Sequence, residues 1–250
     1  MSLAGKVVVV TGGSSGIGRA ISAACARAGA DVALSYRGNA GGAESVASEI
    51  RALGRRAEVF RTDVSRQEEI AALAEGAAAR FGQVDVWINN AGADILTGAG
   101  ERLSRVEKLD LLIAVDLRGT ILASWAAVDL MRGQAGGVII NMSWDHVSLG
   151  MKGENPILYS AAKGGIMSFS KSLARDVAPE IRVNILAPGF IDTAFGQEAG
   201  AGWRREVESR TPLGRWGTPE DVAGAAVYLA SDGAAFLTGQ MLMVNGGVVM

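Results

Sequence analysis

The sequence contains very little cysteine or histidine: Cys25 and His146 are the single residues of each type in 250. One cysteine cannot form an internal disulfide and cannot build a cysteine-based metal centre, so no metal site is expected. Cys25 lies in an alanine-rich stretch with helical spacing, where a buried and unreactive thiol is the natural interpretation.

Blocks of like charge and long apolar runs are also missing. The formal net charge is -2, so neither nucleic acid nor an anionic membrane is an expected partner. No uncharged apolar run is long enough to span a bilayer. The opening "MSLAGKVVVV" lacks the charged and then apolar pattern of a signal peptide. These absences predict a cytoplasmic protein that acts on a small molecule.

Glycine is abundant, with 34 residues, and the hydrophobic content is 49%. Short runs rich in Val, Ile and Leu alternate with segments of helical period, and most runs are nearly unbroken apolar stretches, as in parallel strands covered on both faces. We expect strands at 7–11, 31–36, 57–62, 84–89, 137–142, 182–187 and 241–245. We expect helices at about 16–29, 42–54, 66–81, 102–132, 157–178 and 218–230. The alternation predicts an α/β fold: one Rossmann-type, doubly wound domain over 1–250, with a mostly parallel seven-stranded sheet and helices on both faces.

A glycine-rich turn follows the first expected strand in "VVVVTGGSSGIGRAI". Gly12 allows a tight turn, Gly16 allows the backbone to approach a pyrophosphate, and Gly18 allows close packing of helix on strand. A glycine triplet alone also fits an ordinary flexible turn. Its position between a strand and a helix favours dinucleotide binding, with phosphates at the helix N-terminus. The intervening Ser14, Ser15 and Ile17 are expected to contact the same cofactor.

The end of the second expected strand indicates which dinucleotide is bound. An acidic residue there would hold a ribose 2′-hydroxyl, but this chain has Ser35, Tyr36 and Arg37. Arg37 could bind a 2′-phosphate and stack on adenine, although a solvated surface arginine is the alternative. The sequence therefore predicts a preference for NADP(H), with NAD(H) possible.

Tyr159 and Lys163 stand one helical turn apart, on the same face of an expected helix. A free tyrosine has a pKa near about 10, which is too high for easy proton exchange at neutral pH. A neighbouring ammonium group stabilises the phenolate and lowers that pKa. The pair therefore suits proton transfer to or from a substrate oxygen.

With "TGGSSGIG", "NNAG" (89–92), "YSAAK" (159–163) and "APGFIDT" (187–193) in order, the whole chain resembles the short-chain dehydrogenase/reductase family, in particular 3-oxoacyl-[acyl-carrier-protein] reductases and sugar dehydrogenases. The resemblance implies that hydride moves between the cofactor and a carbonyl carbon while Tyr159 exchanges a proton, and that Lys163 also holds the nicotinamide ribose. It also implies a homotetramer. Further cofactor contacts carried over by motif are Asp63, Val64, Asn90, Gly92, Pro188, Gly189, Ile191 and Thr193.

Two positions depart from the family pattern. Asp116 stands where the family has an asparagine that holds a water for the proton relay, and its charge would raise the pKa of the tyrosine. The family's usual serine after the fifth strand is also altered, because Ser143 is followed by Trp144. Ser143, Asp145 or His146 could each supply the hydrogen bond to substrate. For His146 we expect a partly exposed position in a loop.

The leading hypothesis is an NADP(H)-dependent oxidoreductase that interconverts a ketone and a secondary alcohol. The alternatives are an NAD-linked sugar or polyol dehydrogenase and a catalytically weak nucleotide-binding scaffold or sensor. The segment 189–214 is expected to be a mobile substrate lid. Its Trp203, Arg204 and Arg205 could meet an anionic or carrier-linked substrate, or could simply be surface residues.

Overall fold

Seven parallel strands form one sheet in the computed structural model, which describes residues 1–194, 196 and 200–250. The spatial order is β3-β2-β1-β4-β5-β6-β7, and every neighbouring pair is parallel. The direction of the strand order therefore reverses between β1 and β4. The strands are β1 (Val7–Val10), β2 (Asp31–Tyr36), β3 (Ala57–Arg61), β4 (Val86–Asn89), β5 (Gly137–Met142), β6 (Ile181–Pro188) and β7 (Met241–Val244).

The central strands are mostly apolar because helices cover both of their faces. All four residues of β1 and all four of β4 are buried. Side chains alternate between two cores: Val8 and Val10 belong to one, and Val7 and Val9 belong to the other. All seven strands lie where the apolar runs predicted them, with ends within two residues of the predicted ones, and the predicted Rossmann-type fold is confirmed.

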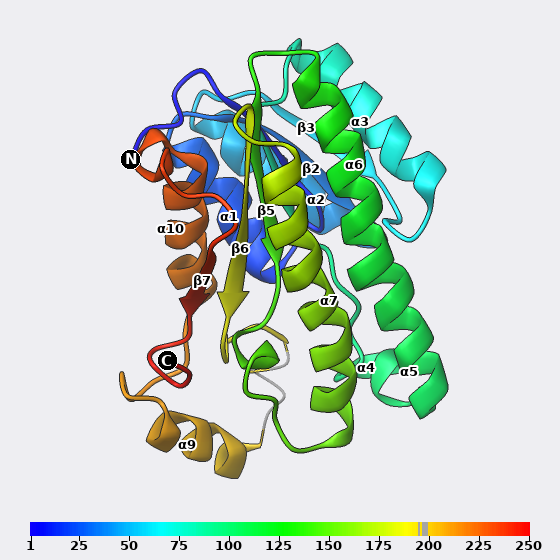
Figure 1. Ribbon diagram of the computed structural model, residues 1–250, viewed down its shortest axis with the longest axis vertical. Helices are drawn as coiled ribbons and strands as arrows, with labels where there is room; N and C mark the ends of the chain where they lie inside the picture. Colours follow the sequence, from blue (N-terminus) through cyan, green and yellow to red (C-terminus); the bar gives the residue numbers. More distant parts are fainter. Residues whose placement is uncertain (195, 197–199) are drawn as a thin grey trace.

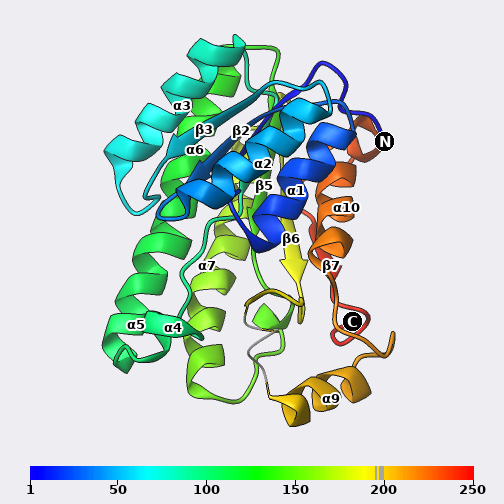
Figure 2. The same ribbon diagram turned by 180° about the vertical axis from the view of Figure 1, so that it is seen from behind.

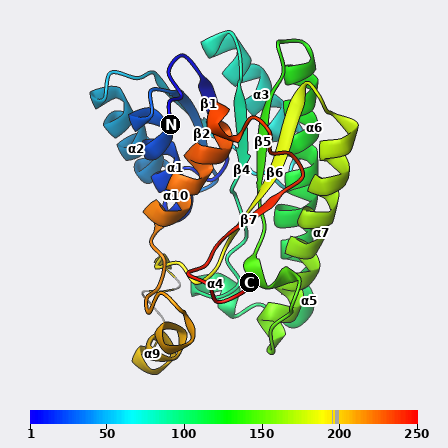
Figure 3. The same ribbon diagram turned by 60° about the vertical axis from the view of Figure 1, so that its left-hand side comes forward.

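Two layers of helices enclose the sheet (Figures 1 and 2). One face carries α1 (Gly16–Arg27), α2 (Ala40–Ala52) and α10 (Pro219–Ala230), and the other carries α3 (Gln67–Phe81), α6 (Gly119–Arg132) and α7 (Glu154–Asp176). Figure 3 views the molecule so that the two layers lie on opposite sides of the strands. The helix α10 begins at Pro219, and Thr218 before it forms a capping box with Asp221. Cys25 is buried in the first layer, as expected, and burial raises the pKa of its thiol to about 12.

The long helix predicted at 102–132 is wrong as a single regular element. The chain instead forms α4 (Gly98–Glu101), α5 (Arg105–Leu112), the π-helical segment η1 (Ile113–Arg118) and then α6. Ser104 starts α5 anew through a capping box with Glu107. The widened turn of η1 carries Asp116, and such turns are frequent at functional sites.

The span Arg105–Arg132 is long and apolar enough to cross a membrane by length and composition alone, and half of its most apolar window is buried inside this chain. Several of its large apolar side chains are nevertheless exposed, among them Val106 and Trp125. Half of the most apolar window of this span therefore belongs to the core, while some large apolar side chains of the span lie on the surface.

The expected lid, 189–214, falls partly outside the described residues. Within the described part, α9 (Ala201–Arg210) was not predicted, because its charged sequence offers little apolar periodicity. Figure 1 shows α9 at the same end of the molecule as the carboxyl ends of the strands. The described residues also include two short 3-10 turns, η2 (Asp145–Val147) and η3 (Asp232–Ala234).

Candidate active site

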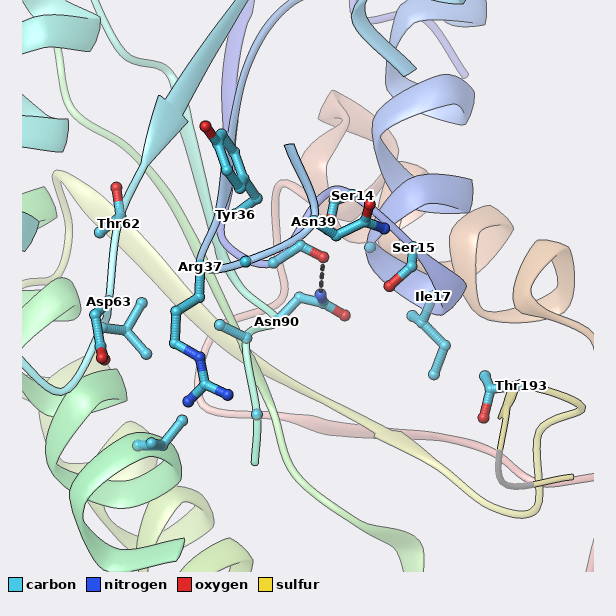
Figure 4. A pocket seen from close by; sticks show the side chains of 17 residues that line it. Ser14, Ser15, Ile17, Tyr36, Arg37, Asn39, Thr62, Asp63, Asn90 and Thr193 are labelled. Atoms are coloured by element: carbon cyan, nitrogen blue, oxygen red, sulfur yellow. Dashed lines mark hydrogen bonds between the residues drawn. The ribbon is translucent and has the colours of Figure 1, made fainter. Parts of the chain in front are cut away.

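A cleft lies at the carboxyl ends of the strands, where the strand order reverses between β1 and β4. Open parallel sheets bind their ligands at this place. The cleft has a volume of ≈ 360 Å³, and Figure 4 shows side chains from several strand ends that meet in it. It is lined by Gly12, Ser14, Ser15, Ile17, Gly18, Tyr36, Arg37, Gly38, Asn39, Thr62, Asp63, Val64, Asn90, Ala91, Gly92, Val115 and Thr193.

The glycine-rich turn has a shape that side chains would obstruct. Gly12 and Gly16 have φ values of 66° and 52°, in the region that glycine adopts without strain. A Cβ on Gly18 would stand 2.1 Å from the carbonyl oxygen of Gly12 and 2.5 Å from Nδ2 of Asn90. The turn is therefore packed against α1 and against the end of β4 so closely that only glycine fits at position 18.

Asn90 fastens the turn to the end of β4. Its Nδ2 donates to the carbonyl oxygens of Thr11 (2.9 Å) and Gly12 (3.2 Å), and its own backbone N–H donates to Oγ1 of Thr11. The bond to Gly12 is the dashed line in Figure 4. Asn90 thus shapes the phosphate-binding turn from outside it.

The N-terminus of α1 is available to an anion. Ser15 is the N-cap residue, but its side chain makes no capping hydrogen bond. The first N–H groups of a helix lack intrahelical partners and carry a partial positive charge. A pyrophosphate would satisfy these donors, and both Ser14 and Ser15 line the cleft beside them. These residues therefore fit the phosphates of a dinucleotide.

Arg37 is exposed and lines the cleft, on the side of Asp63 (Figure 4). Burial raises the pKa of Asp63, but hydrogen bonds from Ser65 and the charge of Arg37 outweigh it, so the pKa lies below its usual value. The Asp63 oxygen Oδ1 already accepts hydrogen bonds from N and Oγ of Ser65. Arg37 itself forms no ion pair within 4 Å among the described residues, which leaves its guanidinium available to an anionic ligand.

Tyr159 and Asp116 both contact the backbone of Ala93, just after β4, and Lys163 joins them through Asp116. The Tyr159 hydroxyl donates to the Ala93 carbonyl oxygen at 3.3 Å. The Ala93 N–H donates to Oδ1 of Asp116 at 2.8 Å, and Oδ2 of Asp116 lies 2.8 Å from Nζ of Lys163. The Asp116–Lys163 contact is an ion pair without the alignment of a good hydrogen bond. Asp116 and Lys163 are both buried, with 1% and 8% of their surface exposed.

The environment of Tyr159 raises the pKa of its hydroxyl well above the ordinary value. Burial is the largest cause, and the charges of Asp116 and Asp94 add to it. The sequence-based expectation that Asp116 would raise this pKa therefore has the right sign. At 2.8 Å the carboxylate also screens the ammonium of Lys163, which would otherwise stabilise the phenolate.

Ser143 is buried and turned to the backbone, where its hydroxyl donates to the Lys163 carbonyl oxygen at 2.8 Å. In the next residues Nδ1 of His146 lies 2.6 Å from Oδ1 of Asp145, and Nδ2 of Asn245 donates to Oδ2 of Asp145 at 3.1 Å. The expectation that His146 is a partly exposed loop residue is wrong, because η2 turns its ring inward and leaves 5% exposed. Nε2 of His146 makes no hydrogen bond within the described part of the chain.

Not all predicted cofactor contacts line the cleft. Gly16, Pro188, Gly189, Ile191, Tyr159 and Lys163 are absent from its wall. Pro188 ends β6, the N–H of Gly189 donates to the Val244 carbonyl, and Ile191 forms an isolated parallel bridge with Gly217. These residues lie around the carboxyl end of β6, and Thr193, which follows them, does line the cleft.

Sequence reasoning missed several residues of the cleft: Tyr36, Gly38, Asn39, Thr62, Ala91 and Val115. All except Val115 follow or end a strand, so their position directly after an apolar run is a signal that could have found them. Val115 reaches the cleft only because η1 places it there, and the π-helical turn has no signal in the sequence.

The comparisons with known proteins agree over nearly the whole chain. The family model described as "Enoyl-(Acyl carrier protein) reductase" matches residues 12–249. The 3beta-hydroxysteroid dehydrogenase 1 of Eggerthella lenta is 36% identical, with 99% of this chain and 95% of that protein covered. The chain belongs to the short-chain dehydrogenase/reductase family. It is accordingly an oxidoreductase, as expected from its motifs.

Two further relatives have different named substrates. The cis-4-hydroxycyclohexanecarboxylate dehydrogenase of Sinomonas cyclohexanicum is 39% identical, with 98% of this chain and 97% of that protein covered. The L-rhamnose 1-dehydrogenase (NAD(P)(+)) of a Sphingomonas species is also 39% identical, with the same coverage. Among solved structures, a short-chain dehydrogenase of Burkholderia cenocepacia in complex with NADP has a TM-score of 0.89 and 33% identity, with 99% of each chain covered.

Proposed function

We propose that this oxidoreductase uses NADP(H) to interconvert a ketone and a secondary alcohol, with Tyr159 as the proton donor and acceptor. One chain of contacts carries the proposal: Tyr159 and Asp116 both bind the backbone of Ala93, and Asp116 is paired with Lys163. That peptide follows Gly92, which lines the cleft. Proton transfer would therefore take place at the edge of the cofactor cleft.

When bound, NADP(H) would supply a hydride to the carbonyl carbon of the ketone, or accept one from the carbon that bears the hydroxyl of the alcohol. In reduction the Tyr159 hydroxyl protonates the substrate oxygen, and in oxidation the phenolate takes the hydroxyl proton of the alcohol. The ammonium of Lys163 stabilises that phenolate, and Asp116 holds the ammonium in place. Pro188, Gly189, Ile191 and Thr193 are proposed to hold the nicotinamide end, with Asp63 and Val64 at the adenine.

The preference for NADP(H) rests on Arg37 and on the missing acid at the end of β2. The NADP complex of the Burkholderia relative supports it. Equilibrium binding of NADPH and NADH, by titration calorimetry, tests it directly. Charge-assisted hydrogen bonds contribute about 1.5–3 kcal/mol, so Arg37→Asp should weaken NADPH binding by about 10-fold to 100-fold and leave NADH less affected. Arg80→Asp, an exposed change on α3, is the matched control. Tighter binding of NADH by the unmodified protein would overturn the preference.

Two alternatives have a specific observation in their favour. The relative that is named a rhamnose dehydrogenase and accepts NAD(P)(+) keeps a sugar or polyol dehydrogenase open. The ion pair of Asp116 with Lys163 and the raised pKa of Tyr159 favour weak catalysis, as in a nucleotide-binding scaffold or sensor. Cofactor-dependent turnover with a ketone panel separates an enzyme from a scaffold.

The proposal also covers assembly and location. Exposed apolar side chains on α5, η1, α6 and α7 support a homotetramer: Val106, Leu109, Ile113, Trp125 and Ile157. The whole chain would act as one cofactor-binding unit, with 189–214 as the lid over its substrate. A cytoplasmic location is proposed because the single thiol is buried and cannot enter a disulfide within the chain.

A further inference from the structure

Aromatic rings gather beside Tyr159 in a chain that has few of them. Three of the five tryptophans and the single histidine take part. Trp144 lies 6.2 Å from the Tyr159 ring and stacks on His146 at 5.0 Å, with 23° between the planes. Phe190 then lies 6.0 Å from His146, and it also contacts Trp203 at 5.7 Å and Trp216 at 5.6 Å, all measured between ring centroids. We call Trp144, His146, Phe190, Trp203 and Trp216 the aromatic wall.

The rings of the wall come from separate parts of the sequence. Trp144 follows β5, Phe190 follows β6, Trp203 lies on α9 and Trp216 precedes α10. His146 and Trp216 are buried at 5% exposure each, whereas Trp144, Phe190 and Trp203 are only partly buried. The wall therefore has a buried base and three partly exposed rings, of which Trp144 lies beside Tyr159. Partly exposed aromatic faces can pack against the ring of a ligand.

The base of the wall is held rigidly. Asp145 is fully buried and joins His146 to Asn245, whose Nδ2 also donates to the Val249 carbonyl oxygen at 2.9 Å. A Cβ on Gly189 would stand 3.0 Å from Oδ2 of Asp145, so the loop after β6 packs directly on this network. The stacked pair of His146 and Trp144 is thereby fixed from two further strands, β6 and β7.

The charged groups that lie against the wall already have partners. The guanidinium of Arg204 lies 5.1 Å from the Trp216 ring, and its Nη1 and Nη2 bind the carboxylate of Asp192 at 3.0 and 3.3 Å. Asp145 is paired with His146 and Asn245. The earlier suggestion that Arg204 meets an anionic substrate is therefore disfavoured, because binding an anion there would require breaking its pair with Asp192.

Trp144 also changes the polarity beside the proton donor. Ser143 directs its hydroxyl to the backbone of Lys163, and the next side chain, the indole of Trp144, lies beside the Tyr159 ring. An indole offers a flat apolar face where a hydroxyl would offer a hydrogen bond. The surface next to Tyr159 thus favours substrates that can place a ring against the indole.

We propose that the aromatic wall binds the ring of an uncharged cyclic ketone or secondary alcohol, aryl or fused alicyclic, with the ring against Trp144 and Phe190 and its oxygen at Tyr159. This rests on the proposed oxidoreductase function. The proposed substrate is therefore a neutral ring compound and not an anionic or carrier-linked acyl chain.

Two measurements test this. Titration calorimetry with the NADP⁺-bound protein gives the Kd of three probes: the neutral bicyclic ketone 1-tetralone, the neutral open-chain ethyl acetoacetate and the anion acetoacetate. NADPH oxidation with the same probes gives kcat and KM. We expect 1-tetralone to bind best. Trp144→Ala should weaken its binding by about tenfold or more, Trp144→Phe should restore most of it, and Phe236→Ala, an exposed ring outside the wall, should change nothing.

The binding measurement tests the ring-binding inference, and the turnover measurement separately tests the proposed reaction. If acetoacetate binds more tightly than 1-tetralone, or if Trp144→Ala binds 1-tetralone as well as the unmodified protein does, the inference is wrong, whatever turns over. If 1-tetralone binds as expected but no probe is reduced, the proposed reaction fails and the wall stands as a ring-binding surface. Circular dichroism of each variant identifies any that fail to fold.

Discussion

Replacing Asp116 by asparagine should move the pH profile of alcohol oxidation to lower pH. In the proposed mechanism oxidation requires the phenolate of Tyr159, so a raised pKa of that hydroxyl moves the rise in activity to higher pH. Burial, the largest cause, is unchanged by the substitution, and the charge of Asp116, the second cause, is removed. The pKa must therefore fall, and the acid limb of the profile must move with it.

The size of the effect follows from the ion pair. Two unit charges 2.8 Å apart interact by about 6 kcal/mol at an effective dielectric constant of about 20. Opposite charges this close act on a third group such as Tyr159 as a pair with little net charge. Uncancelled, a neighbouring cation lowers a pKa by about 1 to 3. Because burial of Tyr159 persists, we expect the apparent pKa to fall by about 1 to 2, which corresponds to about 1.4–2.7 kcal/mol.

The assay is kcat/KM for alcohol oxidation as a function of pH, for the unmodified protein, Asp116→Asn and Asp94→Asn. Asparagine at 116 can still accept the hydrogen bond from the Ala93 N–H, and Asp94→Asn removes the smallest of the three causes. Loss of one partner from a buried pair can cost about 3–5 kcal/mol of stability, so Tm is measured in parallel. An unchanged profile, or one moved to higher pH in a folded Asp116→Asn protein, would refute the reasoning.

Three further outcomes are expected. Gly18→Ala should weaken NADPH binding by about 10-fold to 100-fold in a binding titration. The reason is that its Cβ would overlap the Gly12 carbonyl, and overpacking costs about 1–3 kcal/mol. Gly41→Ala, with open space around it, is the control in the same titration. Ser143→Ala should lower the rate by less than the 10²–10³-fold that a well-placed donor contributes, and His146→Ala should lower it measurably. Steady-state kinetics in which Ser143→Ala abolishes turnover while His146→Ala has no effect contradict the account. Light scattering at micromolar concentration should give the mass of a tetramer, and a monomer mass would defeat the oligomer prediction.

The fold could be predicted from the sequence because its strands are buried on both faces, and such strands read as short unbroken apolar runs. Val7–Val10 is four valines, all buried. The elements that were missed depend on other signals. The π-helical turn at Ile113–Arg118 continues a helical stretch without a sequence pattern of its own, and the helix at Ala201–Arg210 has only one buried residue, Val207.

The cofactor cleft was predictable to a similar degree, because its residues follow the strands in short motifs. The aromatic wall beside Tyr159 was not predictable, because it and its supporting contacts join residues that are far apart in sequence. Asp145 and Asn245, which bond to each other next to His146, are 100 positions apart. The burial of His146 follows from that contact and from its stacking on Trp144. A loop position alone gives no indication of either interaction.

The central claim is that Tyr159 transfers the proton while NADPH reduces a ketone. The most direct measurement follows the absorbance of NADPH at about 340 nm with a neutral cyclic ketone, for the unmodified protein and for Tyr159→Phe, with NADPH binding measured for both. The account predicts turnover by the unmodified protein, and near-complete loss of kcat with retained cofactor binding in the variant, since general acid catalysis contributes about 10²–10⁴-fold. Turnover by Tyr159→Phe within a few-fold of the unmodified rate would contradict it.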